Sequence, residues 1–411
     1  MKSFFEVQPL SAVQALCRDV APLPAERVPL AAAAGRTLAA PLVAGCDLPG
    51  FTRATMDGYA VGAADTFGAS ETLPAYLVCE GVVSMGEVPR VAVSPGRCVQ
   101  ISTGGMLPAG ADAVIMVEHT RRAAGDAVEV LRPAAPGSNV TRADDDVAAG
   151  ATVLPAGQRL RPQDVGLLAA LGCVEVEVRR RPRVAILSTG DEVVPVDAPL
   201  RPGTVRDVNA HALAAQVLEA GGVPVPLGLL PDEQAALRAG VDRAVAGADL
   251  TLLSGGSSLG ARDLTLEVFL GLPGARLLVH GVAVAPGKPF IWVEAGGHHL
   301  LGLPGQVASC LIAFHLFVEP LLERLLGREG RSFGRFRRTL AALTRNLPSA
   351  PGREEYVRVR LLGEGPDRRA EPVLGKSGLL RTLVQSDGLV RIPADCEGLD
   401  AGTAVEVLVF P

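Results

Sequence analysis

Three short loops in the sequence are rich in small residues, and each follows an apolar run. They are Ser188–Glu192, Ser254–Asp263 and Leu303–Ser309. Glycine and serine allow backbone N–H groups to approach a phosphate closely, and a helix that begins at such a loop adds positive potential. The carboxylates of Asp191 and Glu192 could serve a cation or a water, and Asp263 could hold a magnesium ion that bridges phosphate oxygens. This pattern predicts binding of a phosphate-bearing anion together with a cation.

The segments around these loops alternate between the apolar runs of buried strands and the periodic pattern of helices. Strands are predicted at Val184–Ser188, Val223–Leu227 and Leu250–Ser254, and helices at Asn209–Gly221, Glu233–Val245 and Leu264–Leu270. Such alternation predicts a parallel sheet with crossover helices, in which ligands bind beyond the carboxyl ends of the strands. The three loops are therefore expected at one edge of one sheet.

Each of these features alone also has a simpler interpretation. A glycine-rich turn after a strand is more often only a tight connection, and Thr189–Glu192 could be a helix cap with acidic residues in its first turn. The turn Pro286–Pro289 projects the ammonium of Lys288, which suits an oxyanion but equally suits a solvated surface lysine. Asp57 stands before a glycine, which favours an ordinary hairpin turn. The run Asp144–Asp146 is more typical of a solvated acidic turn than of a metal site.

The histidines near the third loop and a cluster of arginines are predicted to have no catalytic role. His298 and His299 follow two glycines and are expected to be exposed at the tip of a hairpin, whereas His315 lies in an apolar helix and is expected in the core. The arginines from Arg328 to Arg338 could bind anions, but a solvated linker face is the favoured interpretation. The sequence contains no Ser-His-Asp signature, Walker motif or HExxH.

The rest of the chain predicts two β-rich regions and three further helices. The first β-rich region has predicted strands at Ala75–Cys79, Val91–Ile101, Ala113–Val117 and Ala127–Leu131, and the second has them at Tyr356–Leu361, Leu389–Ile392 and Val405–Phe410. Helices are expected at Leu10–Val20, Gln163–Leu171 and Gln306–Leu326. The predicted fold class is α/β plus β in a multidomain chain, with a central parallel sheet, an inserted small β domain and a C-terminal β-barrel or sandwich.

Composition limits the partners of the chain. Lys and Arg number 39 and Asp and Glu number 44, so the net charge of −5 argues against attraction of the whole protein to nucleic acid or to an anionic membrane. The apolar runs are too short to span a bilayer. The seven cysteines are scattered without a CxxC pair, which favours reduced thiols and a cytoplasmic location over disulfides or a zinc site.

Several motifs follow one another in the order found in a known family. They are Met56-Asp57-Gly58-Tyr59-Ala60-Val61, Ser102-Thr103-Gly104-Gly105, Gly110-Ala111-Asp112-Ala113-Val114, Ser188-Thr189-Gly190-Asp191-Glu192, Ser254-Gly255-Gly256 with Gly260 and Asp263, Pro286-Gly287-Lys288-Pro289 and Gly302-Leu303-Pro304-Gly305. Together they resemble the molybdopterin molybdenumtransferase family, the MoeA type that includes the E domain of gephyrin. The resemblance covers nearly the whole chain and is loosest in the β-rich tail, where Gly352-Arg353 and Ser377 match the family pattern.

The resemblance implies an elongated homodimer with four domains in each subunit. Residues 1–46 and 140–180 would form a split N-terminal domain, residues 47–139 an inserted β-rich domain, residues 181–327 a molybdopterin-binding α/β domain and residues 328–411 a C-terminal β-barrel. The cleft would lie between the α/β domain of one subunit and the inserted domain of the other.

The resemblance also implies a reaction and the residues that perform it. Adenylylated molybdopterin would be hydrolysed with magnesium (Mg2+) and molybdate inserted into its dithiolene, giving molybdenum cofactor and AMP. The catalytic residues would be Asp57, Glu192, Asp263 and Lys288, with Glu192 and Asp263 at the metal and Asp57 supplied by the partner subunit. The substrate-binding residues would be Thr103, Asp146, Ser188, Thr189, Gly190, Asp232, Gly255, Gly256, Ser258, Gly260, Pro304, Gly305, Arg353 and Ser377. A molybdoenzyme or the adenylylating enzyme would be a further partner.

The sequence departs from the family pattern at three places. Ala285 stands where a second lysine is usual, Asp144 where a glycine is usual, and Gln306-Val307 where Asn-Pro is usual. The leading hypothesis is the molybdenum-inserting enzyme, because its carboxylates and Lys288 are retained. The alternative is a divergent, non-catalytic paralogue that carries molybdopterin or molybdenum cofactor to a target apoenzyme. A scaffold role has no specific support, and the adenylylating activity is disfavoured because it would need only the central domain.

Overall fold

The computed structural model describes residues 7–255 and 259–411, and it gives only the backbone for residues 259–263. The chain divides into two compact units. The first comprises Met1–Arg27, Gly35–Ala39 and Glu177–Pro411, and the second comprises Val28–Ala34 and Ala40–Val176. Each unit has its own sheets and its own buried core. Within the described residues, none of the helices is both long and apolar enough to cross a membrane.

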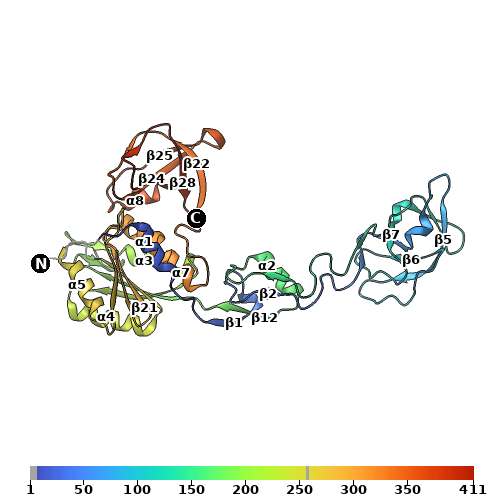
Figure 1. The fold of residues 1–411 in the computed structure, drawn as a ribbon, viewed down its shortest axis with the longest axis horizontal. Helices are drawn as coiled ribbons and strands as arrows, with labels where there is room; N and C mark the ends of the chain where they lie inside the picture. The colour runs from blue at the N-terminus through green and yellow to red at the C-terminus, as the bar shows by residue number, and fades with distance from the viewer. Residues whose placement is uncertain (1–6, 256–258) are drawn as a thin grey trace. The chain divides into compact units, whose positions relative to one another are not determined.

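The first unit is built around a six-stranded sheet (Figure 1). Its strand order is β16 (Val223–Leu230), β13 (Arg183–Thr189), β17 (Leu250–Gly255), β21 (His298–Pro304), β20 (Ile291–Ala295) and β18 (Arg276–His280). The first four strands are parallel, whereas β20 pairs antiparallel with both β21 and β18. The predicted parallel sheet is confirmed for the first four strands, and two further strands extend it.

Helices cover both faces of this sheet, which explains why its central strands are continuous apolar runs. In β13, Val184 and Ile186 belong to one core while Ala185 and Leu187 belong to the other. The first core is shared with α1 (Leu10–Arg18), α3 (Asn209–Glu219) and α7 (Glu319–Leu325), and the second with α4 (Gln234–Gly247) and α5 (Leu259–Leu270). The helices predicted between the strands are confirmed.

The helix predicted at Gln306–Leu326 is interrupted. It consists of α6 (Val307–Ala313), a π-helical segment at Phe314–Val318 and α7. His315 in the π-helical segment is buried, as predicted, and its Nδ1 lies 2.7 Å from a carboxylate oxygen of Glu319. The apolar periodicity is typical of a helix but does not reveal this local change of hydrogen-bonding pattern.

One prediction about charged residues is wrong, and another holds for the exposed Arg331, Arg337 and Arg338 but not for Arg335. His298 and His299 lie in β21 instead of at an exposed hairpin tip, because the two preceding glycines make the turn, and His298 is only 8% exposed. Arg335 does not belong to a solvated face, since its Nε donates to the buried carboxylate of Glu319 at 3.0 Å. In both cases burial is decided by pairing with distant segments, which the local sequence does not encode.

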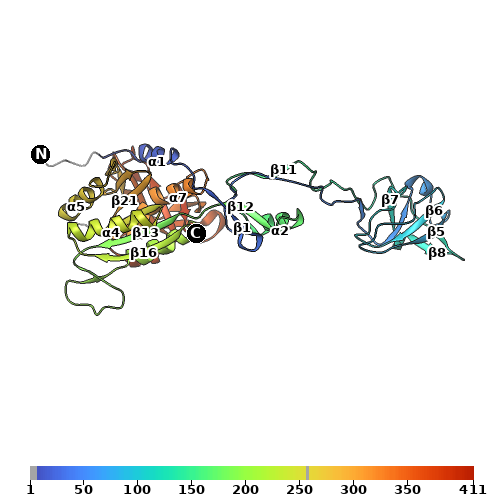
Figure 2. The ribbon, with the colours of Figure 1, turned by 90° about the horizontal axis from the view of Figure 1, so that it is seen from below.

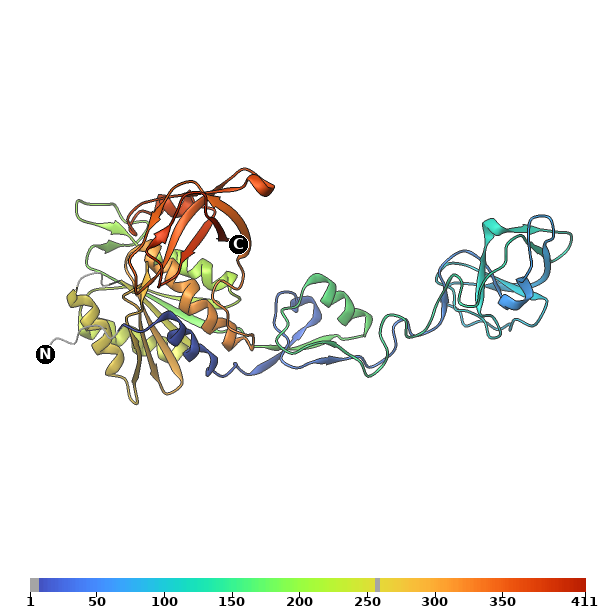
Figure 3. The same cartoon turned by 45° about the horizontal axis from the view of Figure 1, so that its top comes forward.

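The C-terminal part of the first unit is a closed barrel of five strands (Figure 3). Around the barrel, the strands are β24 (Glu354–Leu362), β25 (Arg369–Pro372), β22 (Arg337–Leu343), β28 (Ala404–Val409) and β26 (Gly388–Ile392), which pairs back to β24. A short strand, β19 (Val284–Ala285), adds to β24 in parallel. The predicted C-terminal β-barrel is confirmed.

The second unit contains another six-stranded sheet (Figure 2). Its order is β7 (Ala113–Met116), β4 (Gly58–Val61), β6 (Arg97–Ile101), β5 (Ala75–Val83), β9 (Ala127–Val130) and β8 (Thr120–Arg122). The strand predicted at Val91–Ile101 begins only at Arg97, because Pro95 and Gly96 form a turn in which Gly96 has φ +77°. Helix α2 (Pro162–Ala170) and short strand pairs, among them β2 (Leu42–Val43) with β11 (Thr152–Leu154) and β3 (Arg53–Ala54) with β10 (Val140–Thr141), complete the unit.

Candidate functional site

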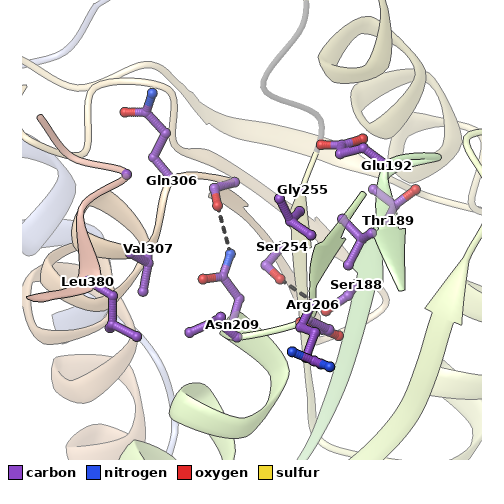
Figure 4. Close-up of a pocket in the computed structure, with 16 residues that line it drawn as sticks. Ser188, Thr189, Glu192, Arg206, Asn209, Ser254, Gly255, Gln306, Val307 and Leu380 are labelled. Atoms are coloured by element: carbon purple, nitrogen blue, oxygen red, sulfur yellow. Dashed lines mark hydrogen bonds between the residues drawn. The ribbon is translucent and has the colours of Figure 1, made fainter. Parts of the chain in front are cut away.

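The candidate site lies at the carboxyl edge of the central sheet. Strands β13, β17 and β21 are adjacent, and their ends are in register, with Thr189 opposite Gly255 and Gly255 opposite Pro304. The loops that the sequence analysis singled out therefore leave the sheet at one edge. A cavity of about 310 Å³ lies there (Figure 4). Its lining comprises Ser188, Thr189, Glu192, Val193, Val205, Arg206, Asp207, Val208, Asn209, Ser254, Gly255, Gly305, Gln306, Val307, Gly378 and Leu380.

Small residues hold the strand ends close together. The buried hydroxyl oxygens of Ser188 and Ser254 lie 3.3 Å apart. Gly255 adopts φ +141°, and a Cβ at this position would lie 2.1 Å from the carbonyl oxygen of Thr189. Only glycine fits such a close approach of two backbones. The base of the cavity is therefore made of backbone and short hydroxyl side chains, which are suited to an anionic group.

Carboxylates fix the loop after β13 and extend it toward the cavity. The hydroxyl of Thr189 donates to a carboxylate oxygen of Asp232 at 2.5 Å, and the N–H of Asp232 donates to the carboxylate of Asp191 at 3.2 Å. Asp232 follows β16, so these bonds join a fourth strand end to the other three. Glu192, in contrast, is exposed and lines the cavity.

The structure adds wall residues that the sequence analysis missed. Short parallel strands β14 (Val193–Val194) and β15 (Val205–Arg206) bring the apolar side chains of Val193 and Val205 and the charged side chain of Arg206 to the cavity. Asn209, the first residue of α3, donates from Nδ2 to the carbonyl oxygen of Gly305 at 2.9 Å. The sequence predicts a helix that begins at Asn209, but no local signal indicates a contact with a loop 96 residues away.

Three predicted residues with positively charged or hydroxyl side chains lie on segments near this edge. The carbonyl oxygen of Ser377 accepts the N–H of Ala308 at 2.9 Å, which places the Ser377 segment beside the start of α6. Lys288 is exposed, and the adjacent Pro289 lines a smaller cavity together with Gly255 and Pro304.

Arg353 directly precedes β24, the strand that pairs with the segment before the Lys288 turn. It is exposed and lies 3.7 Å from Glu355, and the residues after it in β24 pair with β19, which directly precedes the turn. The Lys288 and Ser377 segments therefore lie near the strand ends, and Arg353 lies just before the neighbouring strand β24.

Three predicted residues belong to the second unit. Asp57 directly precedes β4, and its Oδ1 accepts the backbone N–H of Thr103 at 2.6 Å. This hydrogen bond holds the pKa of the exposed Asp57 carboxyl below its usual range, because it stabilises the ionised form. Asp146 is also exposed, and its N–H donates to the carbonyl oxygen of Leu48 at 3.0 Å. Within this unit, Asp57 and Thr103 are brought together.

The side chains of several residues in the second loop lie outside the described part of the structure. Gly256 and Ser258 lie outside the described residues, and the side chain of Asp263, like position Gly260, lies in the part of α5 for which only the backbone is described. In the described portion of the chain, no cluster of three or more His, Cys, Asp or Glu side chains is arranged to hold a metal ion. Magnesium commonly needs only one or two carboxylates when phosphate oxygens and waters complete its shell. The exposed carboxylate of Glu192 fits an ion of that kind, shared with a ligand.

These features define a class of protein. A mostly parallel sheet with small-residue loops at its carboxyl edge, joined in one chain to a closed β-barrel and a separate β unit, is a multidomain α/β protein with its candidate ligand site at the strand ends. Three family models match it. They are the MoeA N-terminal region (domain I and II) at residues 8–172, the probable molybdopterin binding domain at residues 185–324 and the MoeA C-terminal region (domain IV) at residues 341–410.

Similar proteins cover almost the full chain. Molybdopterin molybdenumtransferase 2 of Mycobacterium tuberculosis is 36% identical over 92% of this chain and 94% of its own length, and the molybdopterin molybdenumtransferase of Bacillus subtilis is 32% identical over 91% and 87%. A solved structure of the molybdopterin biosynthesis MoeA protein from Pyrococcus horikoshii has a TM-score of 0.84 and 32% identity and covers 98% of this chain and 100% of that chain. The chain therefore belongs to the molybdopterin molybdenumtransferase family of MoeA type, a family of transferases, as its motifs predicted.

Proposed function

We propose that the chain hydrolyses adenylylated molybdopterin with magnesium and inserts molybdate into the dithiolene, releasing AMP, as a step of molybdenum cofactor biosynthesis. Family membership supports the role in cofactor biosynthesis. The observation that carries the detailed proposal is the convergence of three in-register strand ends on a cavity of about 310 Å³. An adenylylated pterin contains a pyrophosphate, and backbone N–H groups at glycine-containing strand ends favour such anions.

Residue roles follow from the charge and position of each group. The phosphates are assigned to Ser188, Thr189, Gly190, Gly255, Gly256, Ser258, Gly260, Pro304 and Gly305, with Asp232 fixing Thr189. Glu192 and Asp263 would hold the magnesium ion, which when bound supplies positive charge to the phosphate oxygens. Lys288, Arg353 and Ser377 are assigned to molybdate, because a tetrahedral dianion favours charged and hydroxyl donors.

The proposal includes a homodimer in which Asp57, Thr103 and Asp146 of one subunit complete the site of the other. It also keeps the four-domain division and the cytoplasmic location as predictions from the sequence. The dimer is tested by mixing Asp57→Asn and Glu192→Gln subunits, each of which alone is expected to have about a tenth of the wild-type rate or less. If the site is shared, half of the mixed population is heterodimeric and each heterodimer has one intact site, so about a quarter of the wild-type rate returns. No recovery would mean that Asp57 and Glu192 act within one subunit or in no common site.

The reaction is tested by AMP release from adenylylated molybdopterin, measured with and without magnesium and molybdate. The proposal expects AMP release that requires magnesium and that yields molybdenum cofactor when molybdate is present. Binding of the adenylylated pterin without AMP release under any of these conditions would contradict it.

That contradicting outcome would instead support the second candidate, a non-catalytic carrier. The observation that favours a carrier is the changed start of α6, where Gln306 is the N-cap residue without a side-chain capping bond, together with Ala285 in β19. Ala285→Lys with Gln306→Asn and Val307→Pro would then restore AMP release if these substitutions caused its loss.

A further inference from the structure

The start of α6 forms one side of the candidate site but lacks the usual local stabilisation of a helix start. Gln306 is the N-cap residue, with φ −71° and ψ 125°, and its side chain makes no capping hydrogen bond. Asn, Asp, Ser and Thr are favoured at this position because their short side chains reach the N–H groups of the first turn, and proline is favoured at the next position. Here Gln306 is one methylene longer than asparagine, and Val307 is the first helical residue.

Two long-range hydrogen bonds fix this segment instead. The side-chain amide of Asn209 donates to the carbonyl oxygen of Gly305 at 2.9 Å, and the N–H of Ala308 donates to the carbonyl oxygen of Ser377 at 2.9 Å. Asn209 and Gly305 both line the cavity, and the dashed line from Asn209 in Figure 4 marks their bond. Asn209 is only 9% exposed, so water replaces its amide poorly.

The backbone around Asn209, at the start of α3, is fixed by further hydrogen bonds. At the start of α3, the carboxylate of Asp207 accepts the N–H of Ala210 at 3.0 Å. Two turns further along α3, Nε2 of Gln216 lies 2.9 Å from Nε2 of His315, in the π-helical segment that continues α6. Helix α3 therefore contacts the segment from Gly305 to His315 near both ends, and Asn209 is the contact at the cavity.

We infer that Asn209 is a positioning residue for the candidate site: its amide holds the carbonyl of Gly305, and with it the start of α6, which has no side-chain cap of its own. This inference rests on the proposed function for the identity of the ligand, but the hydrogen bond and its structural consequence do not depend on that ligand. The role requires a donor at Asn209, because a carbonyl oxygen can only accept.

The inference is tested with Asn209→Asp, which preserves size and replaces the donor with a titratable group. An ionised carboxylate would face the carbonyl of Gly305 without a hydrogen bond, whereas the protonated carboxyl can donate to it. Burial and the nearby carboxylate of Asp207 raise the pKa of the introduced carboxyl and favour the protonated form, whereas Arg206 on the same cavity and the start of α3 oppose this shift in part. We expect AMP release to be about tenfold below wild type at pH 8 and to recover to within about threefold at pH 5.5, each rate compared with wild type at the same pH.

The chain offers a matched control for this substitution. At Asn346, the side-chain oxygen accepts the N–H of Ala401 at 2.8 Å, so Asn346→Asp keeps the required acceptor and is expected to leave the ratio to wild type constant with pH. A deficit of Asn209→Asp that is the same at both pH values, or no deficit at either, would overturn the inference.

A second readout does not need substrate. Hydrogen exchange of the backbone amides from Gln306 to Cys310 should be faster in Asn209→Asp than in wild type at pH 8, and unchanged in Asn346→Asp. Equal protection in all three proteins would overturn the inference. If the wild-type chain released no AMP, the proposed function would fail, while the exchange experiment would still decide the role of Asn209.

A double-mutant comparison tests whether the start of α6 depends on the Asn209–Gly305 hydrogen bond because it lacks a side-chain cap. Gln306→Asn with Val307→Pro installs the favoured residues, and ψ 125° at residue 306 is compatible with a following proline. In this background Asn209→Asp should cost less than about threefold at pH 8, relative to its own background. An undiminished tenfold loss would show that Asn209 acts independently of the helix start and would overturn the inference in this form.

Discussion

The two edges of the central sheet carry different kinds of side chains: the carboxyl edge forms the candidate ligand site, and the amino edge contains an ion pair that stabilises the fold. At the carboxyl edge, strands end in small residues such as Ser188 and Gly255, and the carboxylate of Glu192 is exposed to the cavity. At the amino edge, Asp249 accepts two bonds from Arg180, at 2.6 and 2.9 Å, directly before β17 begins. Groups that bind a ligand must be free to do so, whereas groups that stabilise the fold pair with one another.

The amino edge also has the larger cavity, about 730 Å³ against about 310 Å³. Several of its polar side chains are nevertheless hydrogen-bonded. Glu294 accepts the N–H of Gly297 at 2.8 Å, and Nε2 of His298 lies 2.8 Å from the hydroxyl oxygen of Thr251. Cavity size therefore does not distinguish the two edges. The difference lies in the carboxylates: that of Glu192 is exposed to the cavity at the carboxyl edge, whereas those of Asp249 and Glu294 are hydrogen-bonded at the amino edge.

The largest expected effect comes from adding a single methyl group at each edge. Gly255→Ala places Cβ against the Thr189 carbonyl, so we expect a loss of about 3 kcal/mol or more in the stability of the central sheet. Gly296, in the hairpin at the amino edge, has φ +59° and nothing within 4 Å of a built Cβ, so Gly296→Ala should cost about 1 kcal/mol. The fluorescence of Trp292, the only tryptophan in the chain, reports unfolding of this sheet in urea. Equal costs would contradict the close-approach argument.

The second prediction concerns pH and the amino edge. Burial lowers the pKa of His298 from 6.5 to about 4, so the unfolded chain takes up this proton at a higher pH than the folded chain. Protonation of His298 therefore does not reduce the free energy of unfolding above pH 6.5. As the pH falls toward 4, it reduces the free energy of unfolding by up to about 3 kcal/mol. The same urea experiment on His298→Asn should show a shallower fall in this pH range. Asp249 and His299 remain in both proteins, so an unchanged slope would assign the pH dependence to them.

Neutralising one carboxylate at each edge tests the comparison between the two edges directly. Glu192→Gln should lower AMP release about tenfold while leaving the urea midpoint unchanged, because its carboxylate faces the cavity. Glu294→Gln should lower stability by about 1 kcal/mol and leave AMP release unchanged, because its carboxylate is bonded to Gly297 and Arg276. Asp197→Asn, an exposed residue on the excursion between β14 and β15, is the control for Glu192. A stability loss in Glu192→Gln without loss of activity would reverse the assignment of the two edges.

The carboxyl edge was largely predictable from the sequence, and the amino edge was not. Small residues directly after apolar runs, at Ser188 and Ser254, are a local signal, and parallel strands necessarily bring such ends together. The predicted exposure of His298 is wrong because the turn ends at Gly297. The strand that follows pairs with β20 and β17 and buries the imidazole. Burial set by strand pairing is a property of the whole sheet.

The candidate site shows the same limit. The family motifs identified the loops, but Asn209 was not singled out, since its partner Gly305 is far away in the sequence. The interruption of the helix at Phe314–Val318 was also missed, because an apolar run has the same periodicity with or without a π-helical segment. Sequence motifs predicted which loops matter, while long-range hydrogen bonds determined how those loops are held.

The smallest expected effect concerns the stability contributed by two ion pairs of the amino edge, Arg276–Glu294 and Arg180–Asp249. The Arg276 side chain is 70% exposed and reaches Glu294 at 3.3 Å, so Arg276→Gln should change stability by less than about 0.5 kcal/mol, and by less still in about 0.5 M salt. Arg180 is 35% exposed and bonds both oxygens of Asp249, so Arg180→Gln should cost about 1–2 kcal/mol and keep most of that cost in salt. Both values come from urea midpoints followed by Trp292 fluorescence. Equal costs would mean that exposure does not rank these pairs. The expected difference would instead locate the stabilising charge beside β17, the strand whose opposite end lies at the centre of the candidate site.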